Sequence, residues 1–577
     1  MEKDTSFEKF KWFYKTYISP KKYWIVFVVV LIFIGATIGN LSPLLYGKML
    51  DSITASDLNL LFKLIVIYFF ITMGTTIFSL IEGFIGQMLS FRLVKKSQKD
   101  LFEKIVTLSQ SSYDKYKSGE LISRLNGDSD TVVSFYLNII TSIMQIIINM
   151  AISIYFVLTI SVRLSSVAIF YIPSSFFITL MSRKYYKLLA LERKKLGDQY
   201  YSYLNESFSN NVGIKSFKLE KMIFSNFDSF ISREFKILKK SFVLSGIMQV
   251  LTTFITVVSS LYIIYLSAIL IKSDLLTIGT MVSFNTYINK LFSSITQVLG
   301  LNISKQEVSV SIDRLWNLFS EKSEQDDEKN DVLVTDANSL EIERAEFSYI
   351  KDNDAVISNL NIKLTAPGFY SFVGKNGCGK STLAKLLIKL YSLNNGKIEI
   401  NGIEYNDYSV YSIRDTITYI QKEDFFLNES VYFNLLLAND KVSKEEIHNI
   451  CNKVGIGEFI ETLPDKYDTI IGEGGSTLSS GQKQKLNVAR AFLRNTSIMI
   501  FDEITANLDG KAEKEIIALL KEISKKSIVI FISHKASSII QSDKIFLMDN
   551  GSIIDSGTHE ELIKSNSIYQ DLFKHIS

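Results

Sequence analysis

A glycine-rich turn near residue 374 has the residue types and the spacing that hold phosphate groups. The stretch "YSFVGKNGCGKSTLAKLLIKL", residues 370–390, reads as an apolar strand, a tight turn and a helix. Glycines in such a turn let backbone N–H groups surround phosphate oxygens, while Lys380 can reach the outer phosphates and Ser381 can bind Mg²⁺. We therefore expect a nucleoside triphosphate here, bound by Gly374, Lys375, Asn376, Gly377, Cys378, Gly379, Lys380, Ser381 and Thr382.

Two later apolar strands end in side chains that suit phosphate chemistry. In "SIMIFDEITANLD", residues 497–509, Asp502 can complete the Mg²⁺ shell and Glu503 can accept a proton from an attacking water. In "SIVIFISHKASSI", residues 527–539, the strand is followed by His534, which would lie beside the terminal phosphate. Acidic pairs and single histidines often follow strands for structural reasons, so the phosphate loop is what gives these residues a chemical role.

A third segment has the features of an anion site at the start of a helix. The stretch "TLSSGQKQKLNVARAFLRN", residues 477–495, is a small polar turn that runs into a helical pattern. The free N–H groups of a helix N-terminus, together with a serine hydroxyl, bind anions readily. We expect this helix start to hold an anion.

The elements that must carry this chemistry form an α/β domain in the second half of the chain. Short β-rich runs alternate with helical patterns there, which is typical of an α/β domain, and the glycine-rich turn predicts that this domain is a P-loop ATPase. A charged stretch, "SEKSEQDDEKND", precedes it at residues 320–331 and suits an exposed linker. We expect a linker over residues 321–338 and a nucleotide-binding domain over residues 339–577.

Residues 1–320 predict an α-helical membrane bundle. Hydrophobic residues make up 47% of the chain while charged residues still make up 21%, so the apolar residues must be concentrated, and they gather in this half. Each of the apolar runs is near or above the roughly 20 residues that span a bilayer. We expect an interfacial helix before Tyr23 and six spans near residues 23–47, 60–90, 134–160, 164–182, 241–271 and 276–302.

The distribution of charge predicts how this bundle is oriented. The loops after the second and fourth runs are long and rich in Lys and Arg, which places them, both chain termini and the ATPase domain on the cytoplasmic side of a plasma membrane. Both loops have helical periodicity with a break, near Ser118 and Gly119 in the first and near residues 210–213 in the second. A net charge of +3 gives no reason to expect a nucleic-acid partner.

Several polar or charged residues lie inside the predicted spans. Such groups are costly in lipid, so we expect them to face a cavity or a neighbouring helix, where interhelical hydrogen bonds alone would account for many of them. Lys290 is the first candidate for a cavity residue, because an ammonium costs more to bury than an amide. The set is Glu82, Gln87, Gln145, Asn149, Gln249, Asn289 and Lys290.

Residues 340–577 resemble the nucleotide-binding domain of an ABC transporter, and the helix start described above resembles its signature motif, usually written LSGGQ. The membrane half resembles the exporter type, with the ATPase fused behind it and with residues 112–128 and 213–221 corresponding to segments that carry coupling helices. In this chain a serine replaces the first glycine of the signature, which adds a side chain where backbone approach is close. The motif stands as Leu478, Ser479, Ser480, Gly481 and Gln482.

The resemblance implies roles for further residues. Tyr349 resembles the aromatic residue that stacks on adenine, and Gln421 resembles the Q-loop glutamine that reaches Mg²⁺ and faces the membrane domain. Asp509 closes a segment that resembles the D-loop, and His534 resembles the switch histidine. In this family the signature of one domain closes over the ATP held by the P-loop of a second. The resemblance therefore implies a homodimer with two working sites, while a heterodimer with a related half-transporter stays open.

The function that the resemblance implies is ATP-driven export by alternating access. Its cofactors are ATP and Mg²⁺, and its partners are a second chain, the lipid bilayer and the exported compound. The expected cargo is a small peptide or a hydrophobic drug-like compound. A lipid flippase stays open, as does a nucleotide-gated sensor or channel that binds ATP without pumping. Enrichment in Lys, Ile and Asn indicates an AT-rich bacterial genome.

Overall fold

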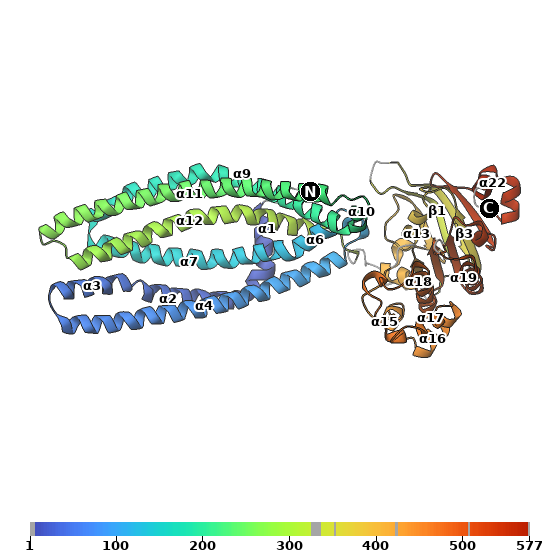
Figure 1. Ribbon diagram of the computed structural model, residues 1–577, viewed down its shortest axis with the longest axis horizontal. Coiled ribbons are helices and arrows are strands. Elements are labelled where there is room, and N and C mark those ends of the chain that lie inside the picture. The colour runs from blue at the N-terminus through green and yellow to red at the C-terminus, as the bar shows by residue number, and fades with distance from the viewer. Residues whose placement is uncertain (1–5, 325–335, 351–353, 422–424, 506–507, 575–577) are drawn as a thin grey trace. The chain divides into compact units, whose positions relative to one another are not determined.

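The computed structural model of the chain forms two compact units (Figure 1). The first unit comprises Met1–Val106 and Tyr116–Glu321, and the second comprises Thr107–Lys115 and Lys322–Ser577. Part of the first predicted cytoplasmic loop therefore belongs to the second unit, and the predicted boundaries at residues 320 and 339 stay predictions. The structure describes residues 6–324, 336–350, 354–421, 425–505 and 508–574, so most of the predicted linker lies outside it.

The first unit consists of long helices that lie alongside one another (Figure 1). By length and composition, four helical segments of the described residues can cross a membrane: Phe7–Thr54, Leu58–Val106, Ser118–Ile160 and Glu220–Lys272. Helices α9 and α12 occupy the places of the predicted fourth and sixth spans, so the count of six stays a prediction. The helices are α1 (Ser6–Phe13), α2 (Lys22–Gly39), α3 (Ser42–Thr54), α4 (Leu58–Val106), α6 (Ser118–Ser123), α7 (Ser129–Ile160), α8 (Val162–Ser165), α9 (Val167–Ser209), α10 (Asn211–Ser216), α11 (Glu220–Lys272) and α12 (Ile278–Phe319).

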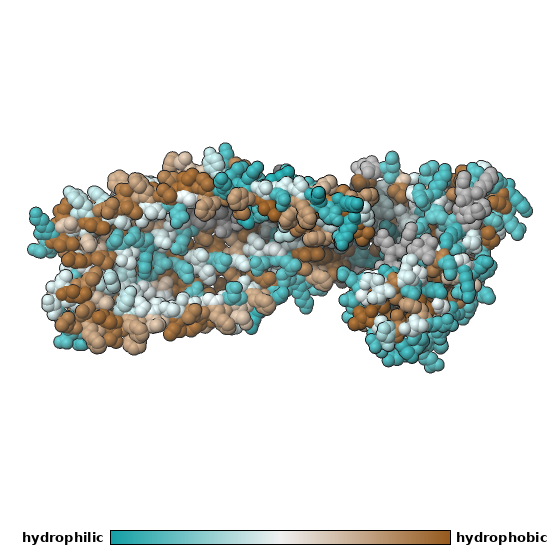
Figure 2. Space-filling view, viewed as in Figure 1, coloured by the Kyte–Doolittle hydropathy of each residue, from teal (hydrophilic) through white to brown (hydrophobic). Residues whose placement is uncertain are grey.

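The packing of these helices divides their side chains between a core and an outer face. α12 packs mainly against α7 and also against α3 and α9, and α9 packs against α11. Their core contains fully buried aromatic residues, including Phe284, Tyr287 and Phe292. Many other large apolar side chains are exposed, and Figure 2 shows them as brown bands along the helices. An exposed apolar surface of this extent suits contact with lipid.

Both long loops contain the predicted break between helices, although the break in the first loop begins earlier in the sequence than expected. α9 ends at Ser209 and α11 begins at Glu220, so the second break lies where its polar residues predicted it. The first break begins after Val106, and α6 then starts at Ser118. It begins early because residues 107–109 hydrogen-bond to residues 322–324, for example from the Ser109 N–H to the Lys322 carbonyl at 3.1 Å.

The second unit contains a six-stranded sheet and a four-stranded antiparallel sheet. In the larger sheet the strand order is β10, β9, β3, β8, β7, β6, and every neighbouring pair except β10 with β9 runs parallel. Its strands are β3 (Gly368–Val373), β6 (Ile417–Ile420), β7 (Ile498–Asp502), β8 (Ile528–Ile532), β9 (Lys544–Asp549) and β10 (Ser552–Gly557). The smaller sheet has the order β2 (Ile357–Thr365), β1 (Ser339–Phe347), β4 (Asn395–Ile400), β5 (Ile403–Glu404).

Both faces of the larger sheet are buried at the central strands β7 and β8, whose sequences are almost continuously apolar. Alternate residues of these strands enter different cores: Ile500 and Ile530 lie in one, and Phe501 and Phe531 lie in the other. The helices of this unit are α5 (Gln110–Tyr113), α13 (Lys380–Leu387), α14 (Val410–Thr416), α15 (Val431–Leu436), α16 (Lys444–Lys453), α17 (Gly457–Glu461), α18 (Ser480–Arg494), α19 (Gly510–Ile523), α20 (Ala536–Ile539), α21 (His559–Ser565) and α22 (Ser567–Lys574).

Side-chain contacts fix the segment Thr107–Lys115 and the start of the chain's second half within this unit. The Tyr391 hydroxyl donates a hydrogen bond to Asp114 Oδ2 at 2.6 Å, and burial, reinforced by that carboxylate, raises the pKa of Tyr391. The Arg414 guanidinium makes two parallel bonds to the Glu324 carboxylate, at 2.7 and 2.8 Å. Bidentate pairs of this kind fix orientation as well as proximity.

Candidate functional site

Strand register brings the predicted phosphate residues to one edge of the six-stranded sheet. Phe372 of β3 pairs with Ile532 of β8, and Ile532 pairs in turn with Asp502 of β7. Ile420 of β6 pairs with Phe501, one residue before Asp502. Because these strands are parallel, the segments that follow them emerge at the same carboxyl edge, where ligands of open α/β sheets bind.

The glycine-rich turn after β3 leads into α13 with a backbone that glycine alone accommodates easily. Gly379 has φ +105°, and a Cβ there would lie 2.8 Å from the Ile357 side chain. The buried Lys380 ammonium donates to the carbonyls of Gly374 and Lys375, at 2.9 Å each. Those carbonyls hold the cation at the mouth of the turn, where the outer phosphates of a nucleotide would meet it. Lys375, Asn376, Gly377 and Ser381 are exposed, while Cys378 and Thr382 are buried.

Asp502 is a buried carboxylate with free coordination capacity. Tyr419 donates to its Oδ2 at 3.2 Å, while Oδ1 has no hydrogen-bond partner among the described residues. Burial raises the pKa of Asp502, and the nearby hydroxyls of Ser381 and Tyr419 act in the opposite direction. A hydroxyl and a carboxylate oxygen are ligands that suit Mg²⁺ when phosphate oxygens and water supply the others. No cluster of three or more His, Cys, Asp or Glu with metal-site geometry occurs in the described part of the chain, so a Mg²⁺ here would depend on the nucleotide.

Glu503 and His534 are in direct contact at this edge. His534 Nε2 lies 3.0 Å from Glu503 Oε1, and both side chains remain partly exposed. Burial lowers the pKa of His534, the charge on Lys380 lowers it further, and Glu503 opposes both effects. The imidazole is therefore neutral at neutral pH, and a proton on Nε2 can be donated to the carboxylate. Glu503 itself has φ +54°, a strained backbone conformation for a residue other than glycine.

Two anchors of this edge were missed by the sequence reasoning. Lys535, which follows the histidine, donates to Glu513 on α19 at 2.9 Å and to the Thr505 carbonyl at 2.8 Å. Ser537 and Ser538 also donate to Glu513. These bonds join the segment after β8 to the segment after β7, so they position Glu503 and His534 relative to one another. A lysine beside the histidine and a Ser-Ser pair are common, and no sequence pattern distinguished them.

The predicted adenine-stacking residue lies beside the turn. Tyr349 is 46% exposed, and its hydroxyl is 3.1 Å from Thr382 Oγ1. Its ring is edge-on to Tyr391 and Phe347, with centroids 5.2 and 4.9 Å away, so one face remains available to a planar base. Tyr391 is a second aromatic residue that the sequence did not single out.

The signature residues form the N-terminus of α18. The Ser479 hydroxyl accepts a bond from the Gln482 N–H, and the Gln482 side chain accepts one from the Ser479 N–H, which is a reciprocal capping box. Ser479 and Ser480 are exposed, Leu478 is buried, and Gly481 lies within the first turn. Among the described residues, no hydrogen bond or ion pair joins residues 478–482 to the turn at residues 374–382.

The two remaining predicted site residues have less distinctive surroundings. Gln421 directly follows β6 and is exposed, but the next three residues lie outside the described part of the chain. Asp509 caps α19 by accepting a bond from the Ala512 N–H at 2.8 Å. Residues 506 and 507 of the predicted D-loop also lie outside the description. The catalytic and binding roles assigned to these residues stay predictions.

A separate polar pocket of about 340 Å³ lies inside the membrane unit, between α2, α4, α7 and α12. Lys290 donates to Asn40 at 3.0 Å, and Asn40 donates to Asn149 at 2.9 Å. Glu82 has no hydrogen-bond or ion-pair partner among the described residues. Of the polar residues predicted to face a cavity or a helix, Glu82, Gln145, Asn149 and Lys290 line this pocket, Asn289 is half-buried, and Gln87 and Gln249 are exposed.

Known protein families match both the membrane unit and the ATPase unit. The model of the ABC transporter transmembrane region matches residues 25–295, and the ABC transporter model matches residues 357–506. A Bacillus subtilis (strain 168) ATP-binding/permease protein named for multidrug export is 28% identical, covering 97% of this chain and 98% of the relative. The lactococcin-G-processing and transport ATP-binding protein of Lactococcus lactis subsp. lactis is 29% identical, over 92% of this chain and 76% of the relative.

A solved structure shares the fold of the whole chain. It is a bacterial Atm1-family ABC exporter with ATP bound, at a TM-score of 0.86 and 21% identity, covering 97% of this chain and 99% of that chain. A helical membrane bundle and an ABC ATPase region therefore occur here in the same order as in a known exporter. With both family models matched in this order, the chain belongs to the ABC transporter family and carries its membrane region and its ATPase region on one polypeptide.

Proposed function

We propose that two copies of this chain associate in the plasma membrane and export a small peptide, driven by ATP at composite sites. One observation carries the proposal. The turn, Asp502, Glu503 and His534 gather at one sheet edge, whereas no hydrogen bond or ion pair among the described residues joins the signature to that turn in its own chain. An exposed helix N-terminus with a serine hydroxyl is suited to the γ-phosphate of ATP. The ATP that it contacts would be the one bound by the second copy.

At each site the residues have separable roles. Ser381, Asp502 and Gln421 would hold Mg²⁺, which when bound neutralises charge on the phosphate oxygens. Lys380 would exchange its two backbone carbonyls for phosphate oxygens. Glu503 would take a proton from the attacking water, while the neutral His534 holds that carboxylate in place through the 3.0 Å contact.

The charge pattern supports the proposed orientation of the chain in the membrane, and the intact catalytic pair supports the proposed homodimer. Both termini and the ATPase unit face the cytoplasm, because the long Lys- and Arg-rich loops lie on that side. Glu503 and His534 are both present, so a homodimer would have two working sites. Binding of two ATP molecules would close the ATPase units and turn the membrane cavity outward, and hydrolysis would reset it.

The pocket of the membrane unit favours a peptide over a hydrophobic drug. It holds a carboxylate, an ammonium and several amides, and Glu82 and Lys290 do not form an ion pair with each other among the described residues. Unpaired charges within a membrane are costly unless they serve a ligand or a partner. A peptide supplies an amine, a carboxylate and backbone amides that can satisfy such groups. A purely apolar compound would leave them unsatisfied.

The first test is ATP turnover by the full-length protein in lipid bilayers, with peptides, hydrophobic drugs or lipids added. We expect Glu503→Gln to lower hydrolysis by about 10²–10⁴-fold while ATP still binds, because it removes the general base. Glu522→Gln, an exposed carboxylate paired with Lys453, is the matched control and should hydrolyse normally. Stimulation by peptides supports the proposal. If the wild type binds ATP yet hydrolyses no faster than the variant, the chain is a nucleotide-gated switch or needs a different partner chain.

A complementation experiment tests the composite site. Lys380→Met disables a P-loop and Ser479→Ala disables a signature, so each variant alone should have little activity. When the two are co-assembled, one of the two sites in each mixed dimer has an intact P-loop and an intact signature. Recovery of hydrolysis in the mixture supports the proposed pairing. No recovery, despite mixed dimers in a two-tag purification, contradicts it.

A further inference from the structure

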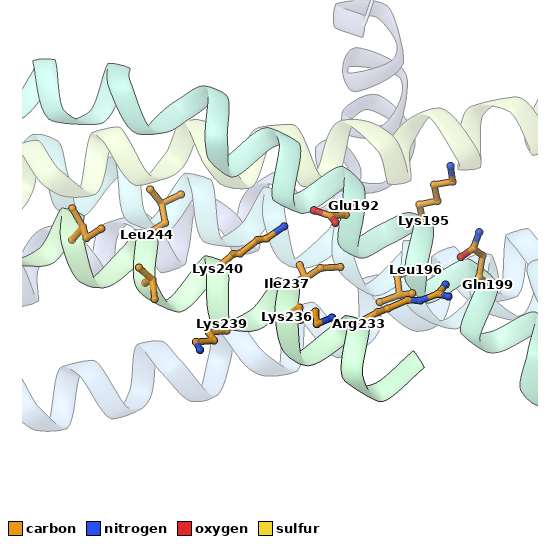
Figure 3. Close-up of a pocket in the computed structure, with 12 residues that line it drawn as sticks. Glu192, Lys195, Leu196, Gln199, Arg233, Lys236, Ile237, Lys239, Lys240 and Leu244 are labelled. Carbon is orange, nitrogen blue, oxygen red and sulfur yellow. The ribbon is translucent and has the colours of Figure 1, made fainter. Parts of the chain in front are cut away.

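A groove of about 720 Å³ runs between α9 and α11 of the membrane unit and shares no lining residue with the polar pocket. Figure 3 shows side chains from these two helices around it, with cations gathered along one stretch and Leu244 farther along α11. Its lining residues come from these two helices alone. From α9 they are Glu192, Lys195, Leu196 and Gln199, and from α11 they are Arg233, Lys236, Ile237, Lys239, Lys240, Val243, Leu244 and Ile247.

One end of the groove carries an excess of positive charge. Five cations line it against the single carboxylate of Glu192. Within the described residues, none of the five has a carboxylate at ion-pair distance, although Arg233 lies over the Phe230 ring. Cations from two facing helices repel one another unless an anion lies between them. The groove therefore has the charge to bind an anion with several cations at once.

The other end of the groove is apolar. Leu196 and Ile237 form a buried floor, 9% and 4% exposed, and Val243, Leu244 and Ile247 continue it along α11. These last three residues belong to the predicted span at residues 241–271, which contains no charged residue. From Arg233 to Ile247 the helix rises about 21 Å, which is the length of a lipid headgroup and part of an acyl chain. The polarity therefore changes along the groove in the same order as in a lipid of the cytoplasmic leaflet.

We propose that this groove binds one anionic phospholipid of the cytoplasmic leaflet. Its phosphate lies among Lys236, Lys239 and Lys240, with Lys195 contributing from α9, and its acyl chain lies along Val243, Leu244 and Ile247. A free phosphate would leave the apolar end in water, a neutral lipid would leave the cations uncompensated, and an apolar drug would bury them. The bound lipid bridges α9 and α11, so it stabilises the pairing of these two helices. The assignment uses the cytoplasmic orientation proposed above but does not depend on which compound is exported.

The test measures lipid retained by the full-length protein in phosphatidylcholine nanodiscs with and without phosphatidylglycerol. Native mass spectrometry counts bound lipids, and competition between the two lipids gives the preference for the anionic one. The test variant is Lys236→Gln/Lys239→Gln/Lys240→Gln. The matched control is Lys95→Gln/Lys96→Gln/Lys99→Gln, which removes the same charge from exposed lysines just beyond the predicted second span.

We expect the groove variant to lose about tenfold or more of the preference for phosphatidylglycerol, and the control to keep it. Leu244→Asn should weaken retention of both lipids, because it disrupts the apolar end. Equal loss in the groove variant and in the control would reduce the effect to general surface charge and overturn the proposal. So would unchanged retention in the groove variant, or full displacement of the lipid by inorganic phosphate, which would identify a free-anion site.

Discussion

The phosphate edge of the ATPase unit and the polar pocket of the membrane unit are built in different ways. At the phosphate edge, each group follows a strand of one parallel sheet, so backbone register places all of them together. In the pocket, the polar groups come from three separate helices and from Asn40 at the end of α2, and side chains such as Asn40 and Lys290 connect them. One site is fixed by the backbone, and the other is defined by side chains alone.

This difference matches what each site has to bind. ATP is the same ligand in every ABC transporter, so a rigid backbone cradle serves it well. A cargo site differs from one transporter to the next, and side chains on helices can change without changing the fold. The two sites also differ in how many hydrogen-bond and ion-pair partners their polar groups have. Lys380 and Glu513 have several partners in their unit, whereas Glu82 has none among the described residues.

Removing the cation of the phosphate turn should have the largest effect. Lys380→Met is expected to lower ATP hydrolysis by about 10²–10³-fold, because preorganised charge on the developing transition state is lost. Steady-state hydrolysis in lipid bilayers measures this. Lys385→Met, on the same helix α13, removes the same charge away from the turn and should change the rate little. A comparable loss in both variants would mean that the effect does not come from the ammonium at the turn.

Changes in the membrane pocket should affect cargo rather than hydrolysis. Glu82→Gln and Lys290→Met are each expected to raise the peptide concentration for half-maximal stimulation by about tenfold, because one charged bond is lost in a low-dielectric site. Unstimulated hydrolysis should stay the same. Gln87→Leu, at an exposed position of the same helix α4 as Glu82, is the control and should behave as wild type. If both pocket variants respond normally to peptide, the pocket is structural.

The same difference explains what could be predicted from the sequence. The turn, Asp502, Glu503 and His534 were predicted because each lies at a fixed place after an apolar strand, and parallel strands bring such places together. Lys290 was predicted as a cavity residue from the cost of burying its charge, and the structure confirms that it lines a pocket. Asn40 was missed, since it lies at a helix end and forms the pocket only through contacts with α7 and α12.

Other features were beyond prediction because distant segments create them. The anchoring of Lys535 on Glu513 joins residues that no local pattern links. The displaced first break arises from hydrogen bonds between residues 107–109 and 322–324, which are far apart in the sequence. Local propensity placed the polar residues near Ser118 correctly but had no information about those bonds. Sequence reasoning was therefore strongest where one strand and its following turn carry the function.

Acid should slow hydrolysis only below the ordinary range of histidine. Burial and the charge on Lys380 lower the pKa of His534 from its usual 6.5, so the imidazole stays neutral as pH falls from 8 toward that value. Below it, protonation removes the neutral partner of Glu503, and the rate should fall several-fold. A pH profile of hydrolysis measures this. An acid limb that begins above pH 6.5, or one that persists in His534→Ala, would contradict the assignment.

Replacing Ser480 with glycine should have the smallest effect on ATP hydrolysis. This variant tests most directly whether the backbone of the signature or the Ser480 side chain decides how the signature contacts the phosphate. The Ser480 side chain is exposed at the first turn of α18, while the N–H groups and the Ser479 hydroxyl form the helix start. If the backbone makes the anion contacts, Ser480→Gly changes hydrolysis by less than about twofold. Ser479→Ala, at the neighbouring residue, removes both the cap and a hydroxyl and should cost about 1 kcal/mol of helix stability together with most of the activity.

A large gain in turnover for Ser480→Gly would mean that the Ser480 side chain holds the signature away from the phosphate. The chain would then be the weaker half of a heterodimer, and its partner's signature would support hydrolysis at this chain's own P-loop.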